Sequence, residues 1–194
     1  MTSSIVLASE SPFRKQLMLQ LGTNFETAKP LANEDLLKTK FKGPQTQLAE
    51  YLAKAKAESL LSLYPNSLII GSDQVLLLNG EILNKPNSKE EVISRLNQLQ
   101  GKTHELHTAL AVYFQGNWES NTIVAELNMK PLTSNEIESY ASLDLAIGCA
   151  GGYKIESKGP LLFNSIKTED HFSIVGLPLL SLSKILNKFG FSPL

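Results

Sequence analysis

The sequence predicts an α/β protein in which helices flank a mixed β-sheet. Short apolar runs are typical of buried strands, amphipathic segments after capping residues are typical of helices, and one Asn-Gly pair between apolar runs indicates a hairpin. A chain of 194 residues with 42% hydrophobic residues can bury a sizeable core, and it contains no linker, repeat or low-complexity segment. We therefore expect residues 1–194 to form a single domain.

The N-terminal third predicts one strand and two helices. Ile5–Ala8 is a short apolar run of the kind that forms a buried strand. Ser9–Pro12 then supplies helix-start residues, with the proline suited to the first helical position, and this helix should end at Gly22. A second helix is expected from about residue 45 to residue 64, where helix-forming residues dominate and apolar residues recur at helical spacing.

The middle of the chain predicts a strand followed by a hairpin. Leu68–Ile70 is a second candidate for a buried strand. Val75–Leu78 and Glu81–Leu83 flank Asn79-Gly80, the pair that favours a type I′ turn. The intervening segment Gly71–Gln74 is therefore expected within or beside a strand.

Two capping-box patterns predict further helices. Ser88 is followed by Glu91 in a helix that should end near Gly101, and Thr133 is followed by Glu136. In each pattern the first side chain caps the helix and the glutamate reaches back to the start of the same turn.

The second half also predicts two long strands and a last helix. Thr103–Phe114 and Trp118–Asn128 are joined across a short turn, so part of the sheet should be antiparallel. Leu177-Pro178 begins an amphipathic segment that should remain helical to Phe189.

Charge and cysteine content narrow the classes of partner. Eighteen Lys and Arg against 19 Asp and Glu give a net charge of -1, which provides no general attraction to nucleic acid or to an anionic membrane. The single Cys149 cannot form an internal disulfide, which fits a reducing compartment. No apolar run is long enough for a signal peptide or a membrane span, so we expect a cytoplasmic protein.

Basic residues suggest where a small anion can bind. Arg14 and Lys15 lie in the first turn of a predicted helix, where each opposes the helix dipole at a cost of about 0.3–1 kcal/mol. A bound anion would explain this placement, because the backbone N–H groups of a helix N-terminus also favour phosphate. Lys56 and Lys85 are further candidates for phosphate contacts. Solvated surface side chains are the alternative for all four.

Two acidic residues are candidates for metal binding or catalysis. Asp73 lies between two apolar runs, so its carboxylate should be buried and needs a metal ion, a basic side chain or backbone N–H groups as a partner. A purely structural contact is equally open. Glu34, in the loop-like segment 31–35, is a second candidate oxygen ligand, because Mg²⁺ and Mn²⁺ favour carboxylates. Taken alone, it is equally consistent with a surface acid.

Other motifs carry little functional weight. His104 and His107 are three residues apart in a predicted strand, which places them on opposite faces and argues against a shared zinc ion. The glycine-rich segment Gly148–Gly152 matches neither a phosphate-binding loop nor a dinucleotide fingerprint, and indicates a tight turn.

The order and spacing of several segments resemble the Maf family along nearly the whole chain. These segments are Leu7–Lys15, Glu34, Lys56-Ala57, Ile70–Val75, Lys85-Pro86, Cys149–Gly151 and Val175–Pro178. The combination of Phe13, Gln74 and Glu156 is most similar to the 7-methyl-GTP pyrophosphatase (YceF-like) branch of that family. Other branches act on dTTP and UTP.

The resemblance implies an activity. It implies an α/β fold with a cleft between two lobes, a homodimer, dependence on a divalent cation (Mg or Mn), and hydrolysis of a nucleoside triphosphate to a monophosphate and pyrophosphate. The first expected substrate is 7-methyl-GTP. The alternatives are a dTTP or UTP pyrophosphatase, and a nucleotide-binding regulator of cell division with little turnover.

The resemblance also implies roles for individual residues. Asp73 becomes the general base, and Glu34 and Asp73 become metal ligands. The implied phosphate ligands are Ser9, Arg14, Lys15, Lys56 and Lys85, and the implied specificity residues are Phe13, Gln74 and Glu156. A 7-methylated guanine carries positive charge, so stacking on Phe13 and attraction to Glu156 would favour it over GTP.

The chain departs from the family pattern at several positions. Lys15 replaces a second arginine, which keeps the charge but loses bidentate geometry, and Asn33 replaces an aspartate, which removes a carboxylate near the expected metal. These departures affect the expected efficiency and substrate choice more than the fold.

Overall fold

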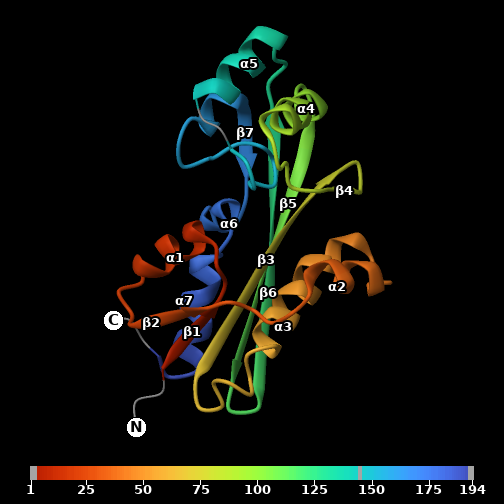
Figure 1. Ribbon diagram of the computed structural model, residues 1–194. Coiled ribbons are helices and arrows are strands. Elements are labelled where there is room, and N and C mark those ends of the chain that lie inside the picture. The colour runs from red at the N-terminus through yellow and green to blue at the C-terminus, as the bar shows by residue number, and fades with distance from the viewer. Residues whose placement is uncertain (1–3, 144–145, 192–194) are drawn as a thin grey trace. The chain divides into compact units, whose positions relative to one another are not determined.

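The computed structural model describes residues 4–143 and 146–191, and its helices and strands are interspersed along the chain (Figure 1). The strands are β1 (Ile5–Ala8), β2 (Phe25–Ala28), β3 (Leu68–Leu78), β4 (Glu81–Leu83), β5 (Thr103–Phe114), β6 (Asn117–Met129) and β7 (Phe163–Lys167). The α-helices are α1 (Pro12–Leu19), α2 (Glu34–Lys40), α3 (Leu48–Glu58), α4 (Lys89–Leu99), α5 (Ser134–Leu143), α6 (Phe172–Val175) and α7 (Leu179–Lys188). Two short 3₁₀ segments are η1 (Gln45–Gln47) and η2 (Gly159–Leu162).

The strands form a mixed seven-stranded sheet, which confirms the predicted fold class. The strand order is β2-β1-β3-β5-β6-β7, with β4 paired to β3. Strand β1 is parallel to both β2 and β3, whereas the pairs β3–β4 and β6–β7 are antiparallel.

The chain divides into two compact units. Unit 1 comprises Met1–Gln74, Thr108–Ile123 and Asp170–Leu194, and unit 2 comprises Val75–His107 and Val124–Glu169. The strands β3, β5 and β6 contribute residues to both units.

Unit 1 buries apolar side chains on both faces of its part of the sheet. On one face, Leu7 and Ile70 pack with residues of α1 and α7, such as Met18 and Leu182. On the other face, apolar residues of β1 and β3 pack with the C-terminal part of α3 and the residues that follow it. In Figure 1, α1 lies on one side of β3 and α3 on the other. Strands covered on both faces read as continuous apolar runs, which is why Ile5–Ala8 predicted β1 correctly.

Unit 2 is built around α4, α5 and the hairpin β3–β4. The helices pack against each other and bury residues such as Val92, Leu96 and Ile137. Asn79 and Gly80 have φ values of 53° and 81° in the turn of the hairpin, as a type I′ turn requires. The predicted hairpin is therefore confirmed.

Both predicted capping boxes lie at helix starts. Ser88 Oγ accepts a hydrogen bond from Glu91 N at 3.1 Å, and Thr133 Oγ1 accepts one from Glu136 N at 3.3 Å. The Thr133 box is reciprocal, because Thr133 N donates to Glu136 Oε2 at 2.7 Å. In the other box the glutamate accepts from Asn87 N instead, at 2.8 Å.

The segment Gly71–Gln74 lies within one continuous strand, β3, as predicted. Two local predictions differ from the structure. The expected helix from residue 45 to residue 64 is divided into η1 and α3, and α3 ends at Glu58. Glu34 lies at the first position of α2 rather than in a loop, because the Asn33 side chain accepts from Leu36 N and caps that helix.

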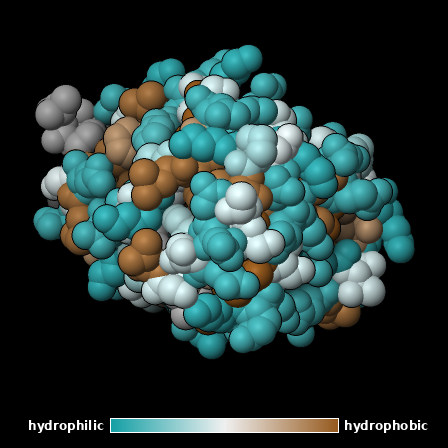
Figure 2. All heavy atoms as spheres, turned by 90° about the horizontal axis from the view of Figure 1, so that it is seen from above, coloured by the Kyte–Doolittle hydropathy of each residue, from teal (hydrophilic) through white to brown (hydrophobic). Residues whose placement is uncertain are grey.

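Hydrophilic residues cover most of the face that Figure 2 shows, with apolar residues scattered among them. None of the helices described by the structure combines the length and the apolar composition that a membrane span requires.

Candidate functional site

The start of α1 is held by serine side chains. Ser11 caps the helix by accepting from Arg14 N at 3.4 Å, and Pro12 follows at its first position. Ser9 is buried at the end of β1, and its hydroxyl accepts from Ser11 N at 3.1 Å. The backbone of Ser9–Arg14 is therefore fixed by its own side chains.

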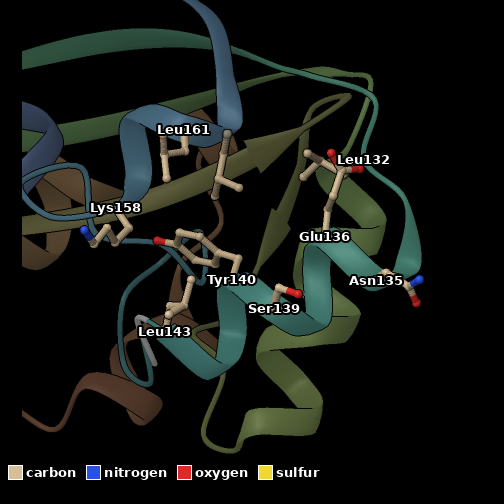
Figure 3. A pocket seen from close by; sticks show the side chains of 9 residues that line it. Leu132, Asn135, Glu136, Ser139, Tyr140, Leu143, Lys158 and Leu161 are labelled. Carbon is tan, nitrogen blue, oxygen red and sulfur yellow. The ribbon is translucent and has the colours of Figure 1, made fainter.

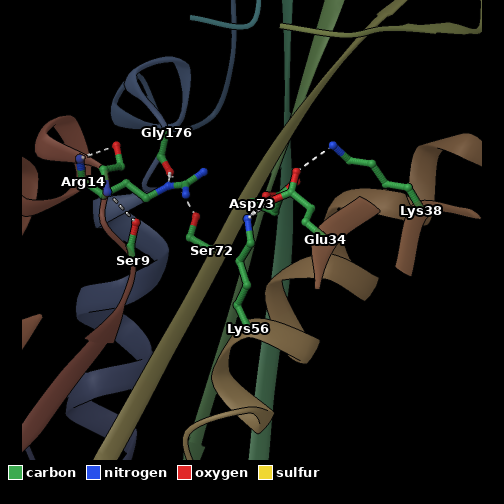
Figure 4. Close-up of polar contacts among 9 residues, drawn as sticks. Ser9, Arg14, Glu34, Lys38, Lys56, Ser72, Asp73 and Gly176 are labelled. Carbon is green, nitrogen blue, oxygen red and sulfur yellow. Dashed lines mark hydrogen bonds and ion pairs between the residues drawn. The ribbon is translucent and has the colours of Figure 1, made fainter. Parts of the chain in front are cut away.

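Arg14 is buried rather than solvated. Its side chain turns back into unit 1, where Nε donates to the carbonyl oxygen of Gly176 at 2.8 Å (Figure 4). Ser72 Oγ donates to the same oxygen at 3.0 Å. Burial lowers the pKa of Arg14, while the nearby carboxylates of Asp73 and Glu34 oppose that effect. The guanidinium thus lies in an acidic environment that compensates its charge.

Lys56 joins the two acidic candidates. Its ammonium forms an ion pair with Asp73 Oδ1 and a second one with Glu34 Oε2 at 2.8 Å (Figure 4). The Lys56 and Asp73 side chains are only 12% and 4% exposed. Asp73 therefore has a basic side chain as its partner, one of the three kinds of partner that the sequence left open.

Glu34 is the outer member of this acidic group. It also pairs with Lys38 at 2.6 Å, one turn further along α2. Burial by itself would raise the pKa of Glu34, but the ammonium groups of Lys56 and Lys38 lower it to about 2. Glu34 is therefore ionised at neutral pH and can act as an anionic ligand.

A glycine allows α3 to approach β3 closely enough for these contacts. Gly71 lies two residues before Asp73, so both face the same side of the sheet. A Cβ atom at Gly71 would lie 2.0 Å from the carbonyl oxygen of Ala53 and 3.0 Å from Ala57 N. Lys56 lies between these two residues on α3 and reaches Asp73 because no side chain separates the two backbones.

Gln74 faces the opposite side of β3 from Asp73. Its amide nitrogen donates to Thr108 Oγ1 at 2.9 Å and to the carbonyl oxygens of Ser173 and Ile174 at 2.9 and 3.1 Å. Thr108 Oγ1 donates to Ser173 O at 2.9 Å, so its proton is already used and it can only accept from Gln74. The backbone of α6 thus fixes Gln74. Thr108 was not among the predicted site residues.

Asp170 is a second residue that the sequence did not single out. It is 1% exposed, and Oδ2 accepts from Leu180 N at 2.8 Å and from Ser181 N at 3.3 Å at the start of α7. Its Oδ1 accepts from Phe172 N at 3.1 Å at the start of α6. One carboxylate therefore orders both ends of the loop whose Gly176 carbonyl holds Arg14.

The other candidates in unit 1 lie on α1. Phe13 is half-buried, and Lys15 is exposed. Arg14, Lys56, Asp73 and Glu34 are thus the predicted residues that the structure brings together, with Ser9 at the end of the neighbouring strand.

The remaining candidates lie in unit 2 and are exposed there. Lys85 follows β4, and Glu156 lies in the turn before η2. The two histidines are structural, as expected: His104 Nε2 is 2.8 Å from the Tyr153 hydroxyl, and His107 Nε2 is 2.7 Å from Glu105 Oε2.

Unit 2 also contains a pocket beside α5. Its cavity of about 300 Å³ is lined mainly by apolar side chains, including Leu132, Leu143 and Leu161, with Lys158 at one edge (Figure 3). None of the predicted site residues lines it. The candidate site is therefore the polar cluster of unit 1.

The cluster offers few protein ligands to a metal ion. Within residues 4–143 and 146–191, no group of three or more His, Cys, Asp and Glu side chains is arranged to hold one. Asp73 and Glu34 do meet on a single ammonium, so two carboxylates already face one cationic centre. Magnesium is often bound in this way, by one or two carboxylates with water and substrate phosphates as the other ligands.

Comparison with known proteins assigns the family. Residues 4–189 match the family model described as Maf-like protein. The chain is 40% identical over 182 residues to a 7-methyl-GTP pyrophosphatase of Bdellovibrio bacteriovorus, covering 94% of this chain and 95% of the relative. It is 39% identical to the protein of that name from Syntrophotalea carbinolica, with 96% and 94% coverage, and 35% identical over the full length of both chains to that of Aliivibrio fischeri. The chain therefore belongs to the family of Maf-like proteins.

Proposed function

We propose that this protein hydrolyses a nucleoside triphosphate between its α- and β-phosphates, with 7-methyl-GTP as the preferred substrate. The observation that carries the proposal is the cluster of Lys56, Glu34 and the buried Asp73, with Arg14 nearby. The relatives named 7-methyl-GTP pyrophosphatase support the choice of substrate.

In this proposal, the cations of the cluster bind phosphate. Arg14 uses Nε for the Gly176 carbonyl, which leaves the two terminal nitrogens of its guanidinium to hold an anion. Lys15 adds an exposed charge on the next residue, and Ser9 a hydroxyl near the start of the same helix. Neutralising the triphosphate is required before water can attack the α-phosphorus. Lys85, in unit 2, is the further phosphate ligand of the proposal.

Asp73 is the proposed general base. Its carboxylate is buried and held by Lys56, so its position is fixed before the substrate binds. Proton transfer from water to this carboxylate would generate the nucleophile. Lys56 places a positive charge beside this carboxylate.

A divalent cation, Mg²⁺ or Mn²⁺, completes the proposal, with Asp73 and Glu34 as its protein ligands. The donor set fits such an ion, because Glu34 is ionised at neutral pH and both carboxylates lie around one centre. When bound, the cation would supply electrostatic stabilisation of the transferring phosphate.

The proposal is tested by incubating the purified protein with 7-methyl-GTP, GTP, dTTP and UTP, with and without Mg²⁺ or Mn²⁺, and measuring pyrophosphate. Turnover of 7-methyl-GTP that requires the cation and is lost in Asp73→Asn is expected. A preference for dTTP or UTP would contradict the substrate assignment. Binding of nucleotide without pyrophosphate release would contradict the enzymatic function.

The preference for the 7-methylguanine nucleobase has its own test. Phe13 and Glu156 are proposed to favour the positively charged 7-methylguanine by stacking and by attraction. Phe13→Ala and Glu156→Gln are therefore expected to lower the ratio of 7-methyl-GTP to GTP turnover. An unchanged ratio in both variants would exclude these residues as the source of specificity.

A further inference from the structure

The chain contains two arginines, Arg14 and Arg95, and both are buried. Arg14 belongs to the cluster of unit 1, whereas Arg95 lies on α4 in unit 2 and has no part in the proposed function. The exposed fraction of Arg95 is 9%. Burying a guanidinium costs free energy unless its N–H groups are hydrogen-bonded, so the acceptors of Arg95 indicate its role.

Arg95 connects two loops by their backbones. Nη1 donates to the carbonyl oxygen of Ala150 at 2.6 Å, and Nη2 donates to that of Asn84 at 2.5 Å. A third, longer contact at 3.4 Å joins Nε to Gln98 Oε1 on the same helix. The planar guanidinium presents its donors in a fixed fork, so the two carbonyls are held at a defined separation.

Each loop carries or leads to a residue that the proposed function assigns to substrate binding. Asn84 directly precedes Lys85, and Ala150 belongs to the glycine-rich turn that leads into Tyr153 and Glu156. A backbone hydrogen bond of 2.9 Å from Gly148 N to Pro86 O joins the same two loops. Lys85 thus lies between two residues whose carbonyl oxygens are both used to fix the backbone.

The turn is also shaped around the arginine. Gly152 has a φ of +70°, and a Cβ atom there would lie 3.4 Å from Arg95 Cγ. Tyr153, the next residue, is buried against the rings of His104 and Phe163. The turn is therefore anchored on both sides, by the Arg95 side chain and by the aromatic core of unit 2.

We propose that Arg95 is a positioning residue, which fixes the backbone around Lys85 and thereby the place from which its ammonium reaches the substrate. This inference rests on the proposed function, in which Lys85 binds phosphate. A lysine side chain has a flexible four-carbon stem, so the position of its backbone is what the fold can control. A misplacement of about 1 Å in such a group is enough to reduce catalysis strongly.

A double-mutant cycle tests the inference. KM and kcat for 7-methyl-GTP are measured for Arg95→Met, Lys85→Met and the double variant. Each single substitution is expected to raise KM by about tenfold, the equivalent of one charge-assisted hydrogen bond, with a smaller change in kcat. If Arg95 acts through Lys85, the double variant is no worse than Lys85→Met alone. Additive effects on KM would overturn the inference.

Two further variants separate positioning from folding. Arg95→Lys keeps the charge and can hold only one carbonyl, so its KM should lie between those of the wild type and Arg95→Met. Gly152→Ala strains the same contact without removing the arginine, and its effect on KM should also disappear in the Lys85→Met background. Thermal unfolding of each variant identifies those that fail to fold. If the Arg95 variants do not fold, Gly152→Ala decides whether the contact acts on KM through Lys85.

The matched control is Lys167→Met, since Lys167 is an exposed lysine on β7 of the same unit. Its KM should equal that of the wild type. A wild-type KM in Lys85→Met would show that Lys85 does not bind the substrate and would overturn the inference, whereas loss of hydrolysis in Asp73→Asn would still support the proposed function. A normal KM in Arg95→Met with a raised KM in Lys85→Met would overturn only the inference.

Discussion

Lys56 on α3 and Asp73 on β3 form an ion pair from which water is nearly excluded, and Glu34 shares the same ammonium. Removing one partner of a buried ion pair leaves an uncompensated charge. We expect Lys56→Met to lower the free energy of unfolding by about 3 kcal/mol, measured by urea denaturation. Lys54→Met is the control on the same helix, because Lys54 is exposed and lies over the Trp118 ring, a contact worth about 1 kcal/mol or less.

The same variant tests the proposed metal site without an activity assay. In Lys56→Met the Asp73 and Glu34 carboxylates lack their shared cation, so Mg²⁺ should raise the unfolding temperature of this variant more than that of the wild type. The additional variant Glu34→Gln should abolish this difference. Equal responses of Lys56→Met and the wild type to Mg²⁺ would argue against a cation site at these carboxylates.

Gly71→Ala should separate α3 from β3. The new Cβ would lie 2.0 Å from a backbone oxygen, a contact that only a shift of the helix can relieve. We expect a loss of about 3 kcal/mol in stability and a large decrease in kcat, because Lys56 moves away from Asp73. The control is Gly116→Ala, in a turn. A Cβ atom at Gly116 would have no atom within 4 Å, so this variant shows only the backbone cost of a φ of +85°, about 1–2 kcal/mol. Similar stabilities and activities of the two variants would contradict the close approach.

Asp170→Ala should affect the polar cluster of unit 1 indirectly, through the loop that holds Arg14. The substitution removes the acceptor of three backbone N–H groups in a buried place, so a loss of about 3 kcal/mol is expected by chemical denaturation. The loop that carries the Gly176 carbonyl would loosen, and kcat should fall because Arg14 loses its fixed partner. Asn33→Ala, which removes the exposed cap of α2, should cost only about 1 kcal/mol. Unchanged kinetics in a folded Asp170→Ala protein would exclude this coupling.

His104 makes stability depend on pH. Burial, and then the charge of Arg95, lower the pKa of His104 from 6.5 to about 4. Between pH 6.5 and 4, the unfolded chain therefore binds a proton at His104 that the folded protein does not. The contribution of the neutral His104 to stability is complete above pH 6.5 and is lost as the pH falls from 6.5 to 4. His104→Gln, which does not titrate but can still contact the Tyr153 hydroxyl, should show a weaker pH dependence of unfolding in that interval. Urea denaturation at pH 7, 5.5 and 4.5 measures it, and equal pH dependence in both proteins would refute the assignment.

The elements predicted correctly are those with strong local signals. Ile5–Ala8 and Ser9–Pro12 predicted β1 and the start of α1, and the Asn79-Gly80 pair predicted the hairpin. In each case the signal is a property of a few neighbouring residues: continuous apolarity, a capping side chain, or backbone conformations with positive φ. Tertiary contacts then reinforce what the local sequence already favours.

The elements that were missed have weak local signals. Strand β2, with the sequence Phe25–Ala28, is only partly covered, and two of its four residues are exposed, so no apolar run marks it. Helix α2 buries none of its residues and therefore lacks an apolar stripe; its start is visible only in Asn33 followed by two acidic residues. Strand β7 has a mixed pattern and is defined by its pairing with β6.

The sequence by itself determined the fold class, the family and the identity of the candidate residues, because those depend on residue types in order along the chain. Only the tertiary structure decided which candidates meet. Lys56 pairs with both Asp73 and Glu34, Gln74 binds the backbone of α6 on the opposite face of β3, and Arg95 fixes the loop of Lys85. These contacts join residues on different elements of the fold. The contact of Lys56 forms because a glycine lets two backbones approach, and that of Arg95 forms because a buried charge requires acceptors.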